Sequence, residues 1–212
     1  MQLQEKTDLK PLVERISRKE PDLVEFRIDS LHTPGPLSGV ARAGSYQTIA
    51  TDRSQKTPSE MKKLLIDATE AGFDYVDVDL KHPFIDEIVR HAKTTKVGVI
   101  ISHHDLTETP AETSLLKLTQ TQQAAGSDIC KIVTTANDPH DNLTILNFIK
   151  QVASTTKIVS FAMGKLGVPS RVLSPSFGAE FTFAAFDSES TTASGQLSID
   201  DLRKAWQLLE IT

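Results

Sequence analysis

The chain has 212 residues, of which 39% are hydrophobic and 24% are charged, which suits one globular domain. Its net charge of -5 gives no basic surface for nucleic acid, and its single cysteine excludes a disulfide framework or a cysteine-rich zinc site. No apolar run is long enough for a membrane span, and the first residues lack the apolar core of a signal peptide, so we expect no membrane partner and a cytoplasmic location.

Helices are predicted between short apolar segments along the whole chain. The first is expected over 9–16, where apolar residues recur with helical spacing. The start at 57–60 has a Thr cap, a Pro and a Glu at the capping-box position, and Gly72 ends that helix. Further helices are expected over 83–92, 111–125, 138–152 and 172–173, and after the cap Ser198, with loops over 32–44 and 191–196.

The apolar segments themselves predict seven strands. They lie near 22–28, 46–51, 73–80, 96–102, 127–134, 157–162 and 180–184. Strands that alternate with helices indicate a parallel α/β sheet, and we predict a single catalytic (β/α)8 TIM barrel over residues 1–212. The eighth strand would have to precede the first helix, where only residues 1–5 are free, so we expect the first strand to be short or missing.

Lys131 stands in an apolar run that is typical of a buried strand. An ammonium group is costly there unless it is paired or neutralised. Burial favours the neutral amine, which can attack a carbonyl carbon. The segment alone favours another interpretation, in which Lys131 lies at a strand end and its side chain reaches water.

Polar residues recur near the C-terminal ends of the predicted strands. They are Glu25, Arg27, Arg53, Asp79, His104, Lys131, Arg171, Thr192 and Gln196. In a (β/α)8 barrel these ends meet at one mouth, where catalytic groups gather. There Lys131 would form an imine with a ketone, His104 would move protons near neutral pH, and the arginines would hold a carboxylate or a phosphate. Taken singly, each residue also has a structural explanation, such as ion pairing of the arginines or a loop cap by the histidine.

The order of these motifs resembles the type I 3-dehydroquinate dehydratase family. The matching segments are EFRID at 25–29, TDR at 51–53, DYVDVDL at 74–80, SHHD at 102–105, DICKI at 128–132, MGKLGVPSR at 163–171, FG at 177–178, TFA at 182–184 and GQL at 195–197. The resemblance implies a barrel that is often dimeric and uses no metal or organic cofactor. It implies a hydro-lyase that converts 3-dehydroquinate to 3-dehydroshikimate in the shikimate pathway to aromatic amino acids.

The resemblance also implies a role for each site residue. Lys131 would form the Schiff base, His104 would be the general acid and base, and Arg171 would bind the substrate carboxylate. The remaining residues would hold the substrate hydroxyls; they are Glu25, Arg27, Arg53 and Gln196. Gln196 would stand beside a covering loop that includes Thr192. Three departures from the family matter, one of which is the truncated or absent N-terminal strand. Asp79 stands where a Glu usually supports the catalytic histidine, and Thr192 replaces a usual Ser.

Two other functions remain open at this level. A class I aldolase would share the barrel and the Schiff-base lysine, but it would normally bind a phosphate, and no Gly-rich phosphate loop follows the last strands. A ligand-binding barrel without activity would explain Asp79 and the short N-terminal segment. The presence of Lys131, His104 and Arg171 together favours the enzyme.

Overall fold

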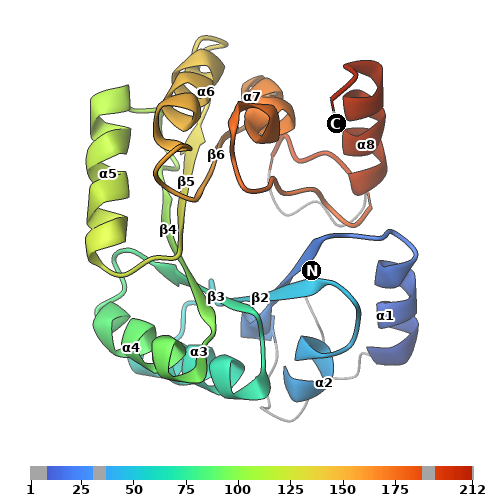
Figure 1. Ribbon diagram of the computed structural model, residues 1–212, viewed down its shortest axis with the longest axis vertical. Helices are drawn as coiled ribbons and strands as arrows, with labels where there is room; N and C mark the ends of the chain where they lie inside the picture. Colours follow the sequence, from blue (N-terminus) through green and yellow to red (C-terminus); the bar gives the residue numbers. More distant parts are fainter. Residues whose placement is uncertain (1–8, 31–36, 188–193, 212) are drawn as a thin grey trace. The chain divides into compact units, whose positions relative to one another are not determined.

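The computed structural model describes residues 9–30, 37–187 and 194–211 (Figure 1). These residues form two compact units. The first comprises the chain up to residue 101 together with 125–127, and the second comprises 102–124 and 128 onwards. Strand β4 (Gly98–His104) passes from the first unit into the second. Each unit is an α/β arrangement in which helices follow strands.

The first unit is built on three strands that pair in parallel. Its elements are α1 (Leu9–Ser17), β1 (Leu23–Arg27), α2 (Leu37–Ala41), β2 (Gln47–Thr51), α3 (Pro58–Ala71), β3 (Tyr75–Asp79) and α4 (Ile85–Thr95). The register pairs Arg27 with Thr51 and Thr51 with Asp77, so the C-terminal ends of the three strands lie side by side. Polar residues at these ends are therefore neighbours, as the sequence predicted.

Helix α3 confirms the start and the end predicted from its sequence. The Thr57 hydroxyl accepts the N–H of Glu60, the Glu60 carboxylate accepts the N–H of Thr57, and Gly72 ends the helix with a left-handed φ of 93°. The predicted loop over 32–44 is wrong in part, because α2 (Leu37–Ala41) forms within it. Three of the five α2 residues are buried along one face, which gives this short helix its stability.

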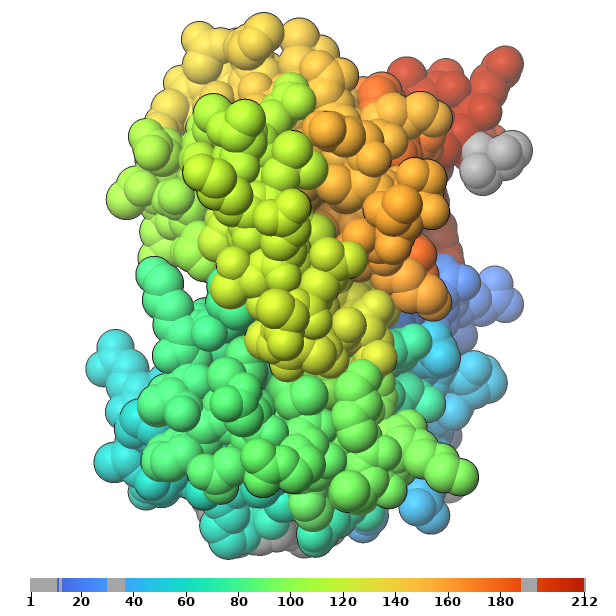
Figure 2. All heavy atoms as spheres, turned by 60° about the vertical axis from the view of Figure 1, so that its left-hand side comes forward, coloured from blue at the N-terminus to red at the C-terminus, as the bar shows by residue number. Residues whose placement is uncertain are grey.

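The second unit contains the end of β4 and two further strands. Its elements are α5 (Glu112–Ala124), β5 (Ile129–Thr135), α6 (Asp141–Val152), β6 (Ile158–Met163), α7 (Val168–Leu173) and α8 (Ile199–Leu208). Strands β5 and β6 pair in parallel from Cys130 with Ile158 to Thr135 with Met163. Side chains of α5 and α6 form the outer surface of this unit, yellow-green to yellow in the space-filling view (Figure 2).

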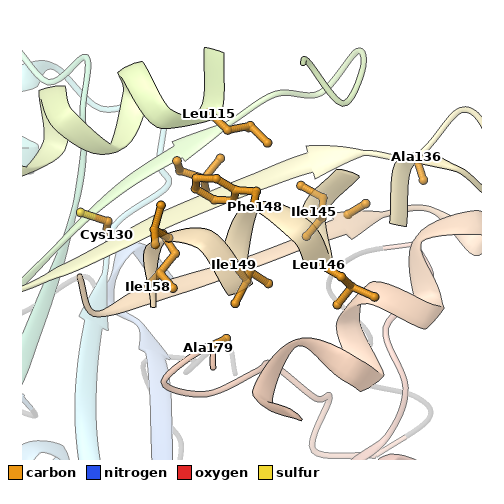
Figure 3. Packing of buried hydrophobic residues seen from close by; sticks show 12 residues of the cluster. Leu115, Cys130, Ala136, Ile145, Leu146, Phe148, Ile149, Ile158 and Ala179 are labelled. Atoms are coloured by element: carbon orange, nitrogen blue, oxygen red, sulfur yellow. The ribbon is translucent and has the colours of Figure 1, made fainter. Parts of the chain in front are cut away.

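The hydrophobic core of the second unit lies between these strands and α5 and α6 (Figure 3). Phe148 of α6 is at its centre, and Leu115 of α5 and Ile132 of β5 are, like it, fully buried. The Cys130 thiol also faces α5, 3.9 Å from the carbonyl oxygen of Thr119. Because side chains alternate along a strand, the residue between Cys130 and Ile132, which is Lys131, points to the opposite face of the sheet.

The described residues contain six strands in the order β1 to β6, so they show an α/β fold and not a complete eight-stranded barrel. The predicted strand over 180–184 is wrong. Its backbone meets β6 only where Glu180 donates to Ile158, and Ala185 forms an isolated bridge with Ser198. Between Glu180 and Ala185 the described backbone does not pair as a strand. The carbonyl oxygen of Phe183 instead accepts a hydrogen bond from the Arg171 guanidinium. The expected first strand falls in residues 1–5, outside the described ranges.

The C-terminal helix begins where the sequence predicted. The Ser198 hydroxyl accepts the N–H of Asp201 at 3.1 Å and caps α8. The Trp206 indole N–H of this helix donates to the carbonyl oxygen of Val172 in α7, at 2.7 Å. Helix α8 therefore holds α7, which carries Arg171, in place.

Candidate active site

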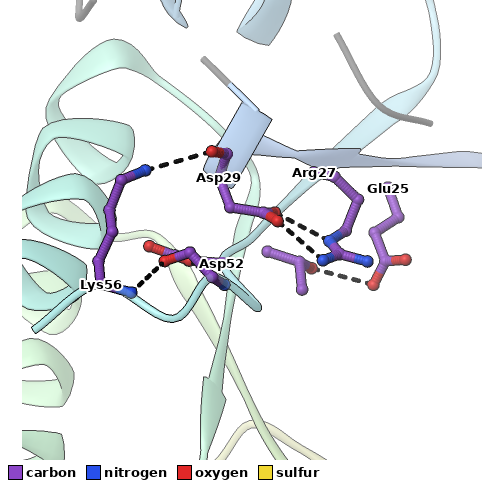
Figure 4. Close-up of polar contacts among 7 residues, drawn as sticks. Glu25, Arg27, Asp29, Asp52 and Lys56 are labelled. Atoms are coloured by element: carbon purple, nitrogen blue, oxygen red, sulfur yellow. Dashed lines mark hydrogen bonds and ion pairs between the residues drawn. The ribbon is translucent and has the colours of Figure 1, made fainter. Parts of the chain in front are cut away.

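Polar side chains of β1, β2 and the turns after them contact one another (Figure 4). The Arg27 guanidinium donates two hydrogen bonds to the Asp29 carboxylate, at 2.9 and 2.8 Å. The Glu25 carboxylate accepts a hydrogen bond from the Thr51 hydroxyl at 2.9 Å. The Lys56 ammonium donates to the backbone carbonyl of Asp29 at 3.2 Å, which fixes the turn after β1. This network holds Glu25 and Arg27 in defined orientations.

Arg53 and Asp77 form the deepest ion pair of the first unit. The guanidinium donates to the carboxylate at 2.7 Å, and the side chains are 24% and 0% exposed. Burial alone would lower the pKa of Arg53, but the charge and hydrogen bond of Asp77, with the charges of Glu25 and Asp79, raise it above its ordinary value. Arg53 is therefore held as a cation among acids. Asp79, the last residue of β3, accepts the backbone N–H of Lys81 at 2.8 Å.

Lys131 is buried, with only 5% of its surface exposed. It is the third of the seven residues of β5, so the predicted strand-end position is wrong, and so is the interpretation that its side chain reaches water. Its ammonium nitrogen lies 4.2 Å from the ring centroid of Phe183. An aromatic face attracts a cation at this distance. The chain thus holds a buried amino group inside the second unit.

Arg171 is a second buried cation, 2% exposed, on the short helix α7. Its guanidinium carbon lies 4.0 Å over the ring of Phe161, and one N–H group donates to the carbonyl oxygen of Phe183 at 3.2 Å. Within the described residues its Nε has no hydrogen-bond partner and no carboxylate pairs with it. Burial lowers the pKa of Arg171 to about 10, so the group stays charged near neutral pH. A buried cation of this kind favours a bound anion.

Two phenylalanine rings connect these cations. The ring centroids of Phe161 and Phe183 are 6.1 Å apart, and each ring carries one of the two cations on its face. The β5–β6 register pairs Val133 with Phe161, which places Phe161 on the same face of the sheet as Lys131. Neither ring is among the site residues predicted from the sequence. Phe183 stands in the TFA motif, but nothing local in that motif indicates contact with a lysine.

His104 is the last residue of β4, and the loop after it is fixed. The N–H of Asp105 donates to the carbonyl oxygen of Val133 at 2.8 Å, and the Thr135 hydroxyl donates to the carbonyl oxygen of Asp105 at 2.9 Å. The Thr107 hydroxyl donates to the Asp105 carboxylate at 2.6 Å and is the main reason why the pKa of Asp105 lies below its ordinary value. These contacts hold the end of β4, with His104, beside the part of β5 that follows Lys131.

Gln196 belongs to a segment that packs against the end of β6. The N–H of Gly164 donates to the carbonyl oxygen of Ser194 at 3.0 Å. Gly195 has a left-handed φ of 77°, and a Cβ atom there would collide with the carbonyl of Gly164. The backbone before Gln196 is thus held at the strand that precedes Arg171. Thr192 lies outside the described residues.

The structure therefore arranges the predicted residues in two sets. The first unit holds Glu25, Arg27, Arg53 and Asp79, and the second holds His104, Lys131, Arg171 and Gln196. Support of His104 by Asp79 stays a prediction. A surface hollow of about 680 Å³ lies at the opposite ends of β2 to β4, beside Arg42, Asp74 and Lys96, and none of the predicted residues lines it.

Among the residues that the structure describes, no group of three or more His, Cys, Asp or Glu residues is placed to hold a metal ion. Of the helices described there, none has the length and apolar character that a membrane crossing requires.

These features define a class of protein, an α/β protein with a buried lysine amine and a buried arginine cation that has no carboxylate partner among the described residues. The chain belongs to the type I 3-dehydroquinase family, whose model matches residues 1–212. It is 32% identical to a 3-dehydroquinate dehydratase of Methanocaldococcus jannaschii over 90% of this chain and 88% of that one. The expected enzyme class, a hydro-lyase of this family, is thereby confirmed, and the family assignment decides against the aldolase.

Solved structures agree with this assignment. A 3-dehydroquinate dehydratase from Geobacillus kaustophilus has a TM-score of 0.86 and 26% identity, over 95% of this chain and 86% of that one. The type I enzyme from Clostridium difficile, solved with covalently modified comenic acid, has a TM-score of 0.81 and 25% identity, over 93% of this chain and 86% of that one. The α/β fold of the described residues is the fold of these enzymes.

Proposed function

We propose that the chain dehydrates 3-dehydroquinate to 3-dehydroshikimate through an imine between Lys131 and the ketone of the substrate. The observation that carries this proposal is the placement of the Lys131 amine, 5% exposed, on one of two adjacent aromatic rings, with the Arg171 guanidinium on the other. The covalently modified ligand in the Clostridium difficile relative supports covalent chemistry in this family. A buried amine is protected there from competing reactions with solvent.

The chemistry follows from the imine. The amine of Lys131 adds to the ketone carbon, and one water leaves as the C=N bond forms. The imine withdraws electrons, so His104 can remove a proton from the carbon next to it. The electron pair then forms a C=C bond while the hydroxyl on the following carbon leaves, protonated by His104, as a second water. Hydrolysis of the imine consumes one water and returns the amine, so the net change is loss of one water.

Arg171 supplies the binding charge in this proposal. A guanidinium offers a planar pair of N–H donors that matches a carboxylate. The Arg171 side chain is packed on Phe161 and has no protein carboxylate among the described residues, so the substrate carboxylate would be its counter-charge. That pairing would fix the ring of the substrate relative to Lys131 and bring the ketone to the amine.

The remaining residues are proposed to hold the hydroxyl groups of the substrate. Glu25 and Arg53 are fixed by protein contacts and present charge at the ends of their strands. Arg27 and Gln196 would complete these contacts, with Thr192 in the covering loop. Asp79 is proposed to orient the His104 imidazole. A homodimer and a cytoplasmic location stay predictions.

Borohydride trapping tests this proposal directly. The protein is mixed with 3-dehydroquinate and borohydride, and the reduced adduct is located by intact mass and peptide mapping. We expect one adduct, on Lys131, and enone absorbance in the ultraviolet when borohydride is left out. Lys131→Met should give neither signal, whereas Lys150→Met, which removes an exposed lysine of α6, should give both. An unmodified protein, or an adduct on another lysine, would contradict the imine.

A further inference from the structure

We propose that Asn142 is a positioning residue of the active site, because its side-chain amide fixes the start of α7 and thereby orients the Arg171 guanidinium. This inference rests on the proposed role of Arg171 as the carboxylate-binding group. Asn142 does not belong to any motif of the sequence analysis. It is the second residue of α6 and is 5% exposed.

The amide of Asn142 connects three stretches of backbone. Its nitrogen donates to the carbonyl oxygens of Pro139 at 3.0 Å and Leu166 at 2.8 Å. Its oxygen accepts the backbone N–H of Ser170 at 2.9 Å. Both donor hydrogens and the acceptor are used, so the orientation of the amide is fixed by its partners. One buried side chain thus holds the loop before α6, the turn after β6 and the residue that precedes Arg171.

The Asn142 side-chain oxygen accepts a hydrogen bond that helix α7 cannot form within itself. The first N–H groups of a helix have no partner within it, and α7 has only six residues. Ser170 is the third of them, so its N–H is one of these groups, and the Asn142 oxygen satisfies it from outside the helix. Without this acceptor, a buried N–H would be left unpaired at the residue next to Arg171, which costs about 1–3 kcal/mol.

Ser170 also connects the first turn of α7 to strand β6. Its hydroxyl donates to the carbonyl oxygen of Gly167 at 2.8 Å and accepts the N–H of Ala162 at 3.0 Å. A Cβ atom at Gly167 would collide with the carbonyl of Ala162, so glycine is required for this close approach. Asn142 and Ser170 therefore hold the first turn of α7 firmly against the strand that carries Phe161.

The backbone and the guanidinium of Arg171 are both held by contacts with the protein, and among the described residues only some of its N–H groups have no partner. Its carbonyl oxygen accepts a hydrogen bond from the Thr182 hydroxyl at 2.9 Å, and its guanidinium packs on Phe161. A guanidinium held in this way loses little conformational freedom when it binds a carboxylate. If the first turn of α7 loosens, that ordering has to occur during binding, and affinity for the carboxylate falls.

The test compares Asn142→Asp with Asn147→Asp, which makes the same change at an exposed position of the same helix. Aspartate keeps the acceptor for Ser170 but offers no N–H to Pro139 or Leu166. Because both donated hydrogen bonds are lost, the acceptor of Ser170 is no longer held in place, and for Asn142→Asp we expect the KM for 3-dehydroquinate to rise about tenfold, with kcat within about threefold of the wild type. Asn147→Asp should change neither. A merely structural role would lower the active fraction, and hence kcat, and leave KM unchanged, which would contradict the proposal.

A double-variant cycle gives the second measurement. In a chain that already carries Arg171→Met, the Asn142→Asp change should cause no further rise in KM, because Asn142 acts through Arg171. An equal rise in both backgrounds would overturn the proposal. Borohydride trapping of cyclohexanone, which has no carboxylate, should proceed equally in the wild type and in Asn142→Asp.

The outcome also separates this inference from the proposed function. Lack of turnover by the wild type would contradict the proposed function alone. Binding of quinate, a cyclic hydroxy acid, measured by calorimetry would then replace KM in the same comparison. An unchanged dissociation constant for quinate in Asn142→Asp would overturn the role of Asn142.

Discussion

The arginines predicted for the site have different surroundings in the two units. In the first unit Arg27 pairs with Asp29 and Arg53 pairs with Asp77, so each guanidinium has a protein carboxylate. In the second unit Arg171 is 2% exposed, and none of the described residues offers it a carboxylate. The Arg171 guanidinium there lies over the ring of Phe161, and the Lys131 ammonium lies over the ring of Phe183.

The difference separates two guanidinium groups that have a protein carboxylate from one that has none among the described residues. A paired guanidinium has already formed its strongest contacts, so it contributes a fixed geometry. A buried cation without an anion lowers stability, because its desolvation is not repaid by an ion pair. Such a cost is typical of binding sites, where the ligand brings the missing charge. The predictions below test this contrast, from the largest expected effect to the smallest.

His104→Ala should have the largest effect, and on turnover alone. General acid and base catalysis contributes about 10²- to 10⁴-fold, so kcat should fall by that factor. The imine should still form, because the Lys131 amine and the Arg171 cation remain, and borohydride should still trap it. His140→Ala, at an exposed position before α6, is the matched control and should keep full activity. Full activity of His104→Ala would remove His104 from the chemistry.

Arg171→Met should separate binding from stability. Loss of a charge-assisted hydrogen bond costs about 1.5–3 kcal/mol, so KM for 3-dehydroquinate should rise by about 10- to 100-fold. The free energy of unfolding in urea should stay the same or increase, because the change removes a buried cation that has no carboxylate among the described residues. Lys150→Met, at an exposed position, is the control for both measurements. A large loss of stability with KM unchanged would show that Arg171 is structural.

Local signals in the sequence predicted what depends on neighbouring residues. The cap at Thr57 and the left-handed turn at Gly72 are set within a few positions, and both are confirmed. The apolar residues around Lys131 indicated a buried strand, but the segment alone favoured a side chain that reaches water, and the structure buries it instead. The family was recognisable because its motifs combine several such local signals in one order.

Contacts between distant segments could not be predicted in this way. The alternation of Phe181, Thr182 and Phe183 indicated a strand, but a strand also needs a partner, and the Arg171 side chain takes the carbonyl oxygen of Phe183 instead. The same limit applies to Asn142, whose partners Leu166 and Ser170 reach it only in the folded chain. The residues that sequence analysis missed are therefore those that orient the site.

The ion pair of Arg53 and Asp77 should give the smallest effect, and one that falls on stability. Arg53→Met leaves a fully buried carboxylate without its guanidinium, whereas Asp77→Asn leaves a cation that is 24% exposed and can still be hydrated. We expect Arg53→Met to lower the free energy of unfolding by about 2 kcal/mol and Asp77→Asn by about 1 kcal/mol. The double variant should lose less than the sum, with a coupling energy of about 1 kcal/mol in urea unfolding. Arg171→Met should show no such loss, because Arg171 has no carboxylate partner among the described residues that the change would leave unpaired. Equal losses of stability for Arg53→Met and Arg171→Met would contradict the contrast between the two units.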